Sequence, residues 1–303
     1  MNNQNCCICN SSCVGPYFCL KTNGLIALKC RKCGHIFIKN SPINSNNASD
    51  FYTMNDFMGE RKLQSKARYV NYYSDCFSDY KNRMDSSLVL KQFKDKVDYF
   101  SYKFPQNGRL LDVGCATGVF LNMMREHGWN VEGVEISDEL ASYARNTFSL
   151  VVHIKDLTME KLVSEPFHVV TLFDVIEHIP DPNLMIAACK DLLAKDGILL
   201  IRTPTEEGLF RSIAKMIYRM SLTKIEFQML WFYSFEHIHS FSLSTLAIIL
   251  KKHGFSVLKV FREEESFERI KITGYVKAIM RSIGLVSLLL NKQHKITIMA
   301  KKC

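Results

Sequence analysis

The sequence lacks any apolar run near the roughly 20 residues that a membrane-spanning helix needs. Glycine and proline are also scarce, at 14 and 7 of 303 residues, which excludes collagen-like repeats and proline-rich disorder. Residues 1–5 contain neither the basic nor the apolar part of a signal peptide. With 47% hydrophobic and 23% charged residues, the chain reads as an ordinary globular protein of one large or two modest domains. We expect it in the cytoplasm.

The net charge of +9 is unevenly distributed. Residues 105–204 carry an acidic excess, whereas the segments on either side carry a basic excess. Solvated surface charge is the simpler interpretation. The functional interpretation is a small anionic partner, which the basic flanks hold near an acidic centre.

Cysteine is abundant and clustered, because seven of the 11 cysteines fall within the first 33 residues. Two Cys-x-x-Cys pairs separated by a strand-rich stretch are typical of a zinc ribbon with a closed tetrahedral site. The predicted metal ligands are Cys6, Cys9, Cys30 and Cys33. Cys7 and Cys13 are alternative ligands in the first pair, and a redox disulfide centre is the less favoured interpretation. Four thiolates leave no open position, so the zinc is predicted to be structural.

The sequence pattern predicts three segments. They are a zinc-ribbon module at 1–45, a helical linker or lid at 46–104, and an α/β domain at 105–303. In the α/β domain, strand-like runs at 109–113, 130–134, 151–154, 169–173 and 197–202 alternate with helical patterns at 119–127, 139–147 and 183–193. Further strands are expected at 255–261 and 295–300, and lid insertions at 205–240 and 263–294. This alternation predicts a Rossmann-like, doubly wound sheet of seven strands.

The first turn of this sheet runs from an acid through small residues into a helix, with Asp112, Gly114, Ala116 and Gly118 at alternate positions. Ligands of open parallel sheets bind at the carboxyl ends of the strands, where glycine permits close approach. A carboxylate at the strand end suits a ligand that carries positive charge rather than a pyrophosphate. The motif resembles that of the class I S-adenosylmethionine-dependent methyltransferases, except that alanine replaces the middle glycine.

Further acids follow later strands in the order of that family. The resemblance implies that Glu135 binds the ribose hydroxyls of S-adenosylmethionine and Asp156 its adenine amine, in the small-molecule branch of the family. The cofactor residues that it implies are Asp112, Gly114, Cys115, Ala116, Gly118, Glu135, Ile136, Asp156, Leu157, Phe173 and Asp174.

Methyl transfer is mainly a matter of alignment, and a base is needed only when the acceptor is a weakly acidic hydroxyl. His178, which begins the helix after the fourth strand, is the candidate base, and Glu177 is a candidate for orienting it. In related O-methyltransferases a histidine here can serve as base; a capping or packing role is the alternative. His237 and His239, alternating on an extended stretch, are expected to face the acceptor. No compact ligand spacing supports a metal shared with Glu177.

We therefore predict a methyltransferase enzyme that O-methylates a small anionic acceptor, such as a sugar nucleotide or a glycan or natural-product intermediate. An RNA or DNA methyltransferase is the alternative, because zinc modules and basic flanks also suit phosphate backbones. A non-enzymatic scaffold with a methyltransferase-like fold is the third hypothesis. An apolar stripe over 276–290 leaves peripheral membrane contact as a further alternative to a core or lid helix.

Overall fold

The computed structural model describes residues 5–39, 41, 108–264 and 274–303. The predicted helical segment 46–104 lies outside these residues. The chain divides into two compact units, one formed by residues 1–45 with 170–303 and the other by residues 46–169. Within the described ranges, no helix combines the length and apolarity needed to cross a membrane.

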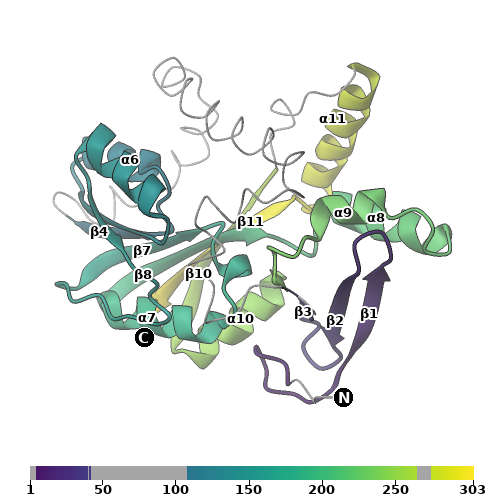
Figure 1. Ribbon diagram of the computed structural model, residues 1–303, viewed down its shortest axis with the longest axis horizontal. Coiled ribbons are helices and arrows are strands. Elements are labelled where there is room, and N and C mark those ends of the chain that lie inside the picture. Colours follow the sequence, from purple (N-terminus) through teal and green to yellow (C-terminus); the bar gives the residue numbers. More distant parts are fainter. Residues whose placement is uncertain (1–4, 40, 42–107, 265–273) are drawn as a thin grey trace. The chain divides into compact units, whose positions relative to one another are not determined.

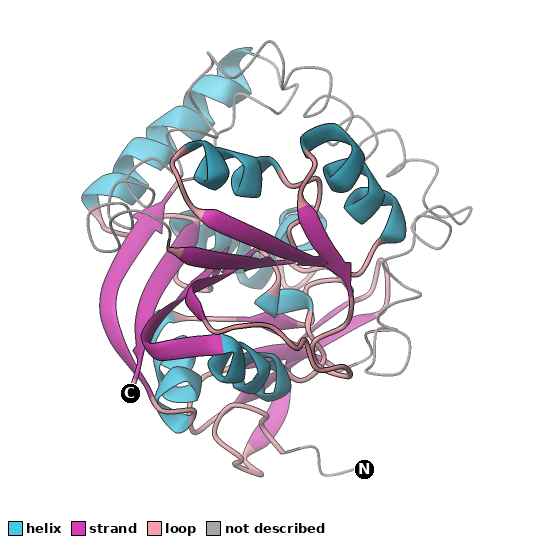
Figure 2. Ribbon diagram, turned by 90° about the vertical axis from the view of Figure 1, so that its left-hand side faces the viewer, coloured by secondary structure: helices cyan, strands magenta, loops and turns pink. Residues whose placement is uncertain are grey.

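The expected α/β fold is confirmed: seven strands form a sheet in the order β10-β11-β8-β7-β4-β5-β6. Its strands are β4 (Arg109–Val113), β5 (Asn130–Glu135), β6 (Val151–Ile154), β7 (Phe167–Phe173), β8 (Leu193–Pro204), β10 (Phe255–Glu263) and β11 (Lys295–Lys302). The division between the two units falls within β7. Along residues 109–204 a helix follows β4, β5 and β7, but none lies between β6 and β7. Figure 2 colours the described helices and strands by type.

In the unit of residues 46–169, β4, β5 and β6 run parallel. Helices α5 (Val119–Glu126) and α6 (Asp138–Phe148) follow β4 and β5. The Ser137 side chain caps α6 by accepting a hydrogen bond from the Leu140 N–H, and two acids occupy the first helical turn. Because the three strands are parallel and joined through helices, their carboxyl ends lie along one edge of the sheet.

In the other unit, β8, β11 and β10 are antiparallel neighbours. Helix α7 (Pro182–Leu192) precedes β8, and α10 (Leu243–Lys252) precedes β10. A capping box between Ser242 and Thr245 begins α10, so the chain enters the helix at a defined residue. The antiparallel β11 pairs with the carboxyl-terminal part of β8, from Lys295 opposite Pro204 to Lys301 opposite Ile198.

The same unit contains the N-terminal module, whose strands are β1 (Val14–Leu20), β2 (Leu25–Cys30) and β3 (Ile36–Ile38). These strands are antiparallel, and β3 also pairs with β9 (His239–Ser240), which completes a four-stranded sheet. Strand β1 was not expected from the sequence. The segments expected as insertions contain α8 (Leu209–Met220), α9 (Phe227–Phe232) and α11 (Gly274–Leu289).

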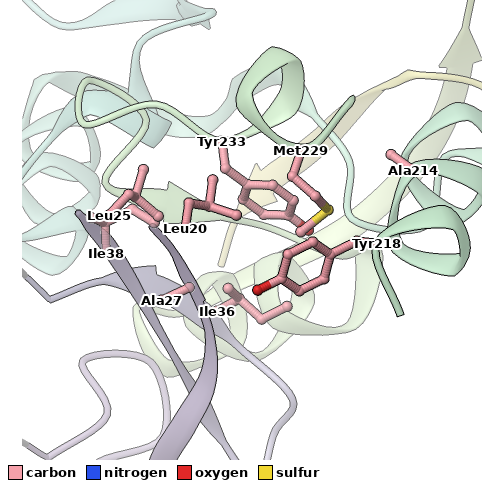
Figure 3. Close-up of a cluster of buried hydrophobic side chains, with 9 residues drawn as sticks. All are labelled: Leu20, Leu25, Ala27, Ile36, Ile38, Ala214, Tyr218, Met229 and Tyr233. Atoms are coloured by element: carbon pink, nitrogen blue, oxygen red, sulfur yellow. The ribbon is translucent and has the colours of Figure 1, made fainter. Parts of the chain in front are cut away.

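The N-terminal module shares a hydrophobic core with helices α8 and α9 and the residue after α9 (Figures 1 and 3). Its buried members are Leu20, Leu25, Ala27, Ile36, Ile38, Ala214, Tyr218, Met229 and Tyr233. The Tyr218 hydroxyl also donates a hydrogen bond of 2.9 Å to the carbonyl of Cys19. Glu226 accepts bonds of 2.8 Å from the N–H groups of Lys21 and Thr22. The module is therefore packed into this unit rather than tethered beside it.

Candidate functional site

Three carboxylates lie at or just beyond the carboxyl ends of the parallel strands in the unit of residues 46–169. Asp112 lies near the end of β4 opposite Gly133, and Glu135 ends β5 opposite Ile154. Asp156 follows β6 by two residues. The structure thus brings the three predicted cofactor acids to one edge of the sheet, with Asp112 and Glu135 buried and Asp156 half-buried.

The loop after β4 has alternating left-handed residues, with φ of 75° at Gly114, 46° at Ala116 and 76° at Gly118. Ala116 adopts this conformation despite its Cβ, at the position where the family motif has glycine. At Gly118, an added Cβ would lie 2.6 Å from Leu150 Cδ1 and 2.9 Å from Ala144 Cβ. The backbone therefore turns sharply into α5, and Gly118 is required by packing as well as by φ.

Glu135 holds this loop against the next strand. Its carboxylate accepts hydrogen bonds from the Ala116 N–H at 2.8 Å and from the Ser137 N–H at 2.9 Å. Burial raises the pKa of Glu135, although these N–H donors oppose the rise. A carboxylate with one bond on each oxygen retains lone pairs for a further donor such as a ribose hydroxyl.

The remaining residues predicted for this edge differ in exposure. Asp156 accepts from both the N–H and the hydroxyl of Thr158, at 2.8 and 2.7 Å, which fixes the turn after β6. Leu157 is buried, whereas Ile136 is half-buried. Cys115 is buried, and burial raises the pKa of its thiol. A Cβ added at Gly133 would lie only 2.6 Å from Cys115 Sγ, so the sulfur atom fills the space beside this glycine.

Asp174, predicted as a cofactor residue, is engaged in ion pairs within the other unit. It pairs with Arg202, and Lys295 Nζ lies 3.1 Å from its Oδ1. The two cations outweigh the effect of burial and lower the pKa of Asp174. The half-buried Phe173 lies beneath the same arginine, whose Cζ is 5.5 Å from the ring centroid. Asp174 is therefore an ionised carboxylate whose charge is balanced by residues of β8 and β11.

Glu177, His178 and His237 form a second cluster in this unit. They offer three potential metal-ligand atoms within 4.8 Å of one another, and the rings of His178 and His237 lie 4.7 Å apart in an edge-to-face arrangement. Glu177 Oε2 accepts from the Thr203 hydroxyl at 2.9 Å, whereas its buried Oε1 has no hydrogen-bond partner within the described residues. The sequence predicted all three as residues near the acceptor, but the close convergence of their ligand atoms was not predicted, because His237 is distant along the chain.

The backbone fixes the tautomer of His178. Its Nδ1 lies 2.8 Å from the carbonyl oxygen of Glu236, so Nδ1 carries the proton and donates it to that oxygen. The lone pair therefore resides on Nε2. Burial lowers the pKa of His178, despite the opposing effect of Glu236, and keeps the ring neutral at pH 7. Burial and the nearby Asp174 raise the pKa of Glu177 to about 8.

The four predicted metal ligands of the N-terminal module converge, with all four sulfur atoms within 4.8 Å. Cys6 Sγ lies 3.6 Å from Cys33 Sγ, and Cys9 Sγ lies 3.6 Å from Cys30 Sγ. Tetrahedral zinc with bonds of about 2.3 Å places its thiolates about 3.8 Å apart, so this set fits zinc. Burial raises the pKa of Cys30, but N–H groups of Cys33 and Lys32 and neighbouring thiols outweigh it and lower that pKa to about 7. Zinc itself stays a prediction.

His239 does not join His237 in the second cluster. It lies on β9, buried, with its Nδ1 3.0 Å from His35 Nε2 and 4.0 Å from Cys7 Sγ. Burial lowers the pKa of His239 to about 4. The two histidines expected to face one acceptor thus have different surroundings, because β9 pairs with β3 of the N-terminal module.

A family model described as a methyltransferase domain matches residues 83–260, which is more than half of the 303-residue chain. The chain belongs to this methyltransferase-domain family. The predicted resemblance to class I methyltransferases is confirmed at the level of fold and family, whereas the family match does not extend to the N-terminal cysteines.

Curated relatives of this methyltransferase domain include two proteins named ubiquinone biosynthesis O-methyltransferase. The one from Actinobacillus pleuropneumoniae serotype 7 (strain AP76) is 34% identical over 122 residues, which are 36% of this chain and 51% of the relative. The one from Xanthomonas axonopodis pv. citri (strain 306) is 34% identical over 139 residues, or 41% and 57% of the two chains. The chain therefore spans about half the length of the curated relatives it matches.

Among solved structures, a chain of the complex containing the Haloferax volcanii Trm112 methyltransferase activator is similar, with a TM-score of 0.50 and 13% identity. The match covers 70% of this chain and 92% of that chain. At this identity the likeness supports the fold alone. It agrees with the α/β sheet described for this methyltransferase domain.

The strand-end residues of the methyltransferase domain fit S-adenosylmethionine in their chemistry. Asp112 and Glu135 are acceptor groups at the ends of adjacent parallel strands, and the turn between β4 and α5 has left-handed residues that bring its backbone close to that edge. Carboxylates suit the hydroxyl and amine donors and the positive charge of that cofactor.

Several partners of the predicted residues were missed from the sequence. They are Ser137 beside Glu135, Thr203 beside Glu177, Glu236 beside His178, Arg202 and Lys295 beside Asp174, and His35 with Cys7 beside His239. One signal was available for His35, which directly follows the second Cys-x-x-Cys pair and glycine. Ser137 is also local, since it lies two residues after Glu135. For the other pairs no local spacing links the two members, because the contacts join separate strands and loops.

Proposed function

We propose that this chain is an S-adenosylmethionine-dependent methyltransferase that acts on a hydroxyl group of a small molecule. The observation that carries the proposal is the row of carboxylates Asp112, Glu135 and Asp156 at the ends of three adjacent parallel strands. The family match over residues 83–260 supports the same activity. Bound S-adenosylmethionine would supply a methyl group activated by its sulfonium.

The donor-binding residues have distinct roles in this proposal. Glu135 would accept hydrogen bonds from the ribose diol while it holds the Ala116 N–H in place. Asp112 would balance the positive end of the cofactor, and Asp156 would accept from the adenine amine. The turn at Gly114 and Ala116 would bring backbone close to the ligand, which a bulkier loop would prevent.

His178 is proposed as the base that removes the acceptor's hydroxyl proton. The Glu236 carbonyl orients its ring and keeps the proton on Nδ1, so that Nε2 can accept a second proton. Glu177 and His237 line the same cluster and would stabilise the imidazolium that forms. Above its raised pKa of about 8, Glu177 would stabilise the imidazolium as a carboxylate. Below that pKa, the protonated Glu177 would do so through a hydrogen bond.

For the acceptor, we propose a small biosynthetic intermediate with an ionisable hydroxyl. Support comes from the relatives named for ubiquinone biosynthesis, which are not named for a sugar nucleotide or a glycan. The predicted anionic character of the acceptor rests on the basic segments that flank residues 105–204. We further propose that Cys6, Cys9, Cys30 and Cys33 hold a structural zinc ion, given the convergence of their sulfur atoms.

Donor binding is tested by calorimetry with S-adenosylhomocysteine. Asp112→Asn and Glu135→Gln are each expected to weaken binding by at least 10-fold, the loss of about 1.4 kcal/mol of a charge-assisted bond. Asp138→Asn is the matched control, because Asp138 is an exposed acid three residues beyond Glu135. Equal affinity in wild type and both site variants would remove the basis of the proposal.

The acceptor is identified by incubating the full chain with methyl-labelled S-adenosylmethionine and a metabolite extract. Mass spectrometry of the labelled product gives the acceptor and the methylated atom. A labelled small molecule with a new methyl ether is expected. Label found only in RNA or DNA would support the alternative substrate class instead.

A further inference from the structure

A third cluster of potential metal ligands lies apart from the tetrathiolate set and from Glu177, His178 and His237. It consists of Cys7, His35 and His239, whose ligand atoms all lie within 4.8 Å of one another. His35 Nε2 is 3.0 Å and Cys7 Sγ is 4.0 Å from His239 Nδ1. We propose that these three residues bind a second zinc-class ion, distinct from the tetrathiolate zinc.

Strand pairing, burial and a hydrogen bond fix the residues of this cluster. His239 lies opposite Phe37 in the antiparallel pair of β9 and β3, and both imidazoles are buried. The backbone of Cys7 is fixed by a hydrogen bond of 2.9 Å from the Asn183 side chain to its carbonyl. Although Cys7 follows Cys6 directly, its thiol lies with the two histidines and not with the four thiols of the other set. The ligands are thus placed by three separate segments of one compact unit.

The orientation of His239 suits metal binding. Its Nε2 lies 3.3 Å from the carbonyl oxygen of Pro180, so Nε2 carries the proton and donates it. The lone pair on Nδ1 therefore points to the side where His35 and Cys7 lie. A histidine that ligates a metal commonly donates its other N–H to a backbone carbonyl, which fixes the ring in this way.

The ligand types select the class of ion. A thiolate with two imidazoles matches the borderline softness of zinc, and hard cations such as magnesium prefer oxygen. With bonds of about 2.0 to 2.3 Å, tetrahedral zinc would place these atoms about 3.3 to 3.6 Å apart. The distances of 3.0 and 4.0 Å in the cluster lie on either side of that range, and small side-chain shifts suffice to reach it. Three protein ligands leave a fourth position for a water molecule or another small ligand.

Aromatic rings pack around the pair of histidines. The centroid of Phe241 lies 5.1 Å from that of His35 and 5.7 Å from that of His239, and Phe37 stacks on His35 at 6.0 Å. An ion in these apolar surroundings would connect the N-terminal module to β9. It would therefore link a zinc ribbon to the segment that also carries His237.

The test counts metal in the full chain after it is stripped and reloaded with Zn²⁺ alone. We expect His239→Gln and Cys7→Ser each to hold one equivalent fewer than wild type, by mass spectrometry of the metal after desalting. Cys13→Ser is the control, since Cys13 is exposed and outside both sets. An unchanged count in folded His239→Gln would overturn the proposal and leave a hydrogen-bonded histidine pair. Because the result is the difference in bound zinc between variant and wild type, it does not depend on how fully the tetrathiolate site is occupied. The Cys30→Ser variant measures the occupancy of that site separately.

A second measurement needs no variant, in case the substitutions impair folding. Titration of the stripped wild-type chain with Co²⁺ is expected to give two spectral phases, one of tetrathiolate and one of mixed thiolate and imidazole coordination. The visible absorption bands of the second phase should be those of Co²⁺ coordinated by three or four ligands that include nitrogen. A single phase that saturates at one equivalent of Co²⁺ would refute the second site.

Discussion

The tautomer of His178 is set by one backbone contact, the 2.8 Å bond from its Nδ1 to the Glu236 carbonyl. We expect His178→Gln to reduce labelled methyl transfer by about 10²- to 10⁴-fold, because glutamine cannot accept the acceptor's proton. S-adenosylhomocysteine affinity should be nearly unchanged. His253→Gln, an imidazole at the end of α10, serves as the control. Full activity in His178→Gln would show that the reaction needs no base at this position.

Glu177 gives a prediction for stability against pH. Its pKa is about 8 in the folded chain and about 4.5 in the unfolded chain, so the folded state holds the proton more tightly. The contribution of this group to stability should therefore be complete below about pH 4.5 and be lost as pH rises through about 8, by at most about 1.4 kcal/mol per pH unit. Urea unfolding across this range, without added divalent metal, measures the slope.

The matched variant for this slope is Glu177→Gln, which keeps an oxygen to accept from the Thr203 hydroxyl but does not titrate. Its stability should depend less on pH between 5 and 8 than that of wild type. Glu139→Gln, at an exposed position of α6, should leave the slope unchanged. Parallel profiles for wild type and Glu177→Gln would mean that the carboxyl is ionised throughout.

At the scale of elements, the turn between β4 and α5 depends on Gly118. Gly118→Ala should destabilise the fold by about 2 to 4 kcal/mol, since a left-handed φ and a steric overlap with Leu150 and Ala144 add together. Gly128→Ala isolates the first effect, because Gly128 has φ of +84° but no atom within 4 Å of an added Cβ. Chemical denaturation of both variants separates the two contributions. Equal losses would assign the whole effect to backbone conformation.

The elements near Gly118 are also those that the sequence predicts well. The strand-turn-helix pattern from Arg109 to Glu126 and the acid of the following strand, Glu135, are local signals, and the predicted strand and helix limits agree with the structure to within a few residues there. The ligand spacing of Cys30 and Cys33 is local as well. Strand β1 was missed because its residues, from Val14 to Leu20, show only weak alternation of burial, with one buried residue at the end.

Contacts between distant segments could not be predicted in the same way. The side chain of His239 meets His35, 204 positions earlier (239 minus 35), and His237 meets His178. No periodicity or spacing encodes such pairs, and the pair of His35 and His239 depends on the pairing of β3 with β9. The sequence therefore supports candidate residues for the site but leaves the division of the histidines between two clusters to the tertiary structure.

At the scale of the molecule, the N-terminal module and helices α8 and α9 should unfold together. Leu25→Ala is expected to cost about 2 to 5 kcal/mol, because Leu25 is buried in the core that the module shares with Tyr218 and Tyr233. Scanning calorimetry should show the transition of this unit shifting to lower temperature without splitting. Lys32→Ala, at an exposed position of the module, is the control. A separate early transition in Leu25→Ala would indicate an independent domain.

The pairing of β3 with β9 also bears on how the chain is made. Ile36 meets Ser240, which the ribosome adds 204 positions later (240 minus 36). At about 5 to 20 residues per second, the emerging N-terminal segment waits roughly 10 to 40 s for its partner strand. During that interval its apolar side would be uncovered on the nascent chain. Early metal loading at the cysteines, which are close together in the sequence, would keep this segment folded until the rest of its core has been synthesised.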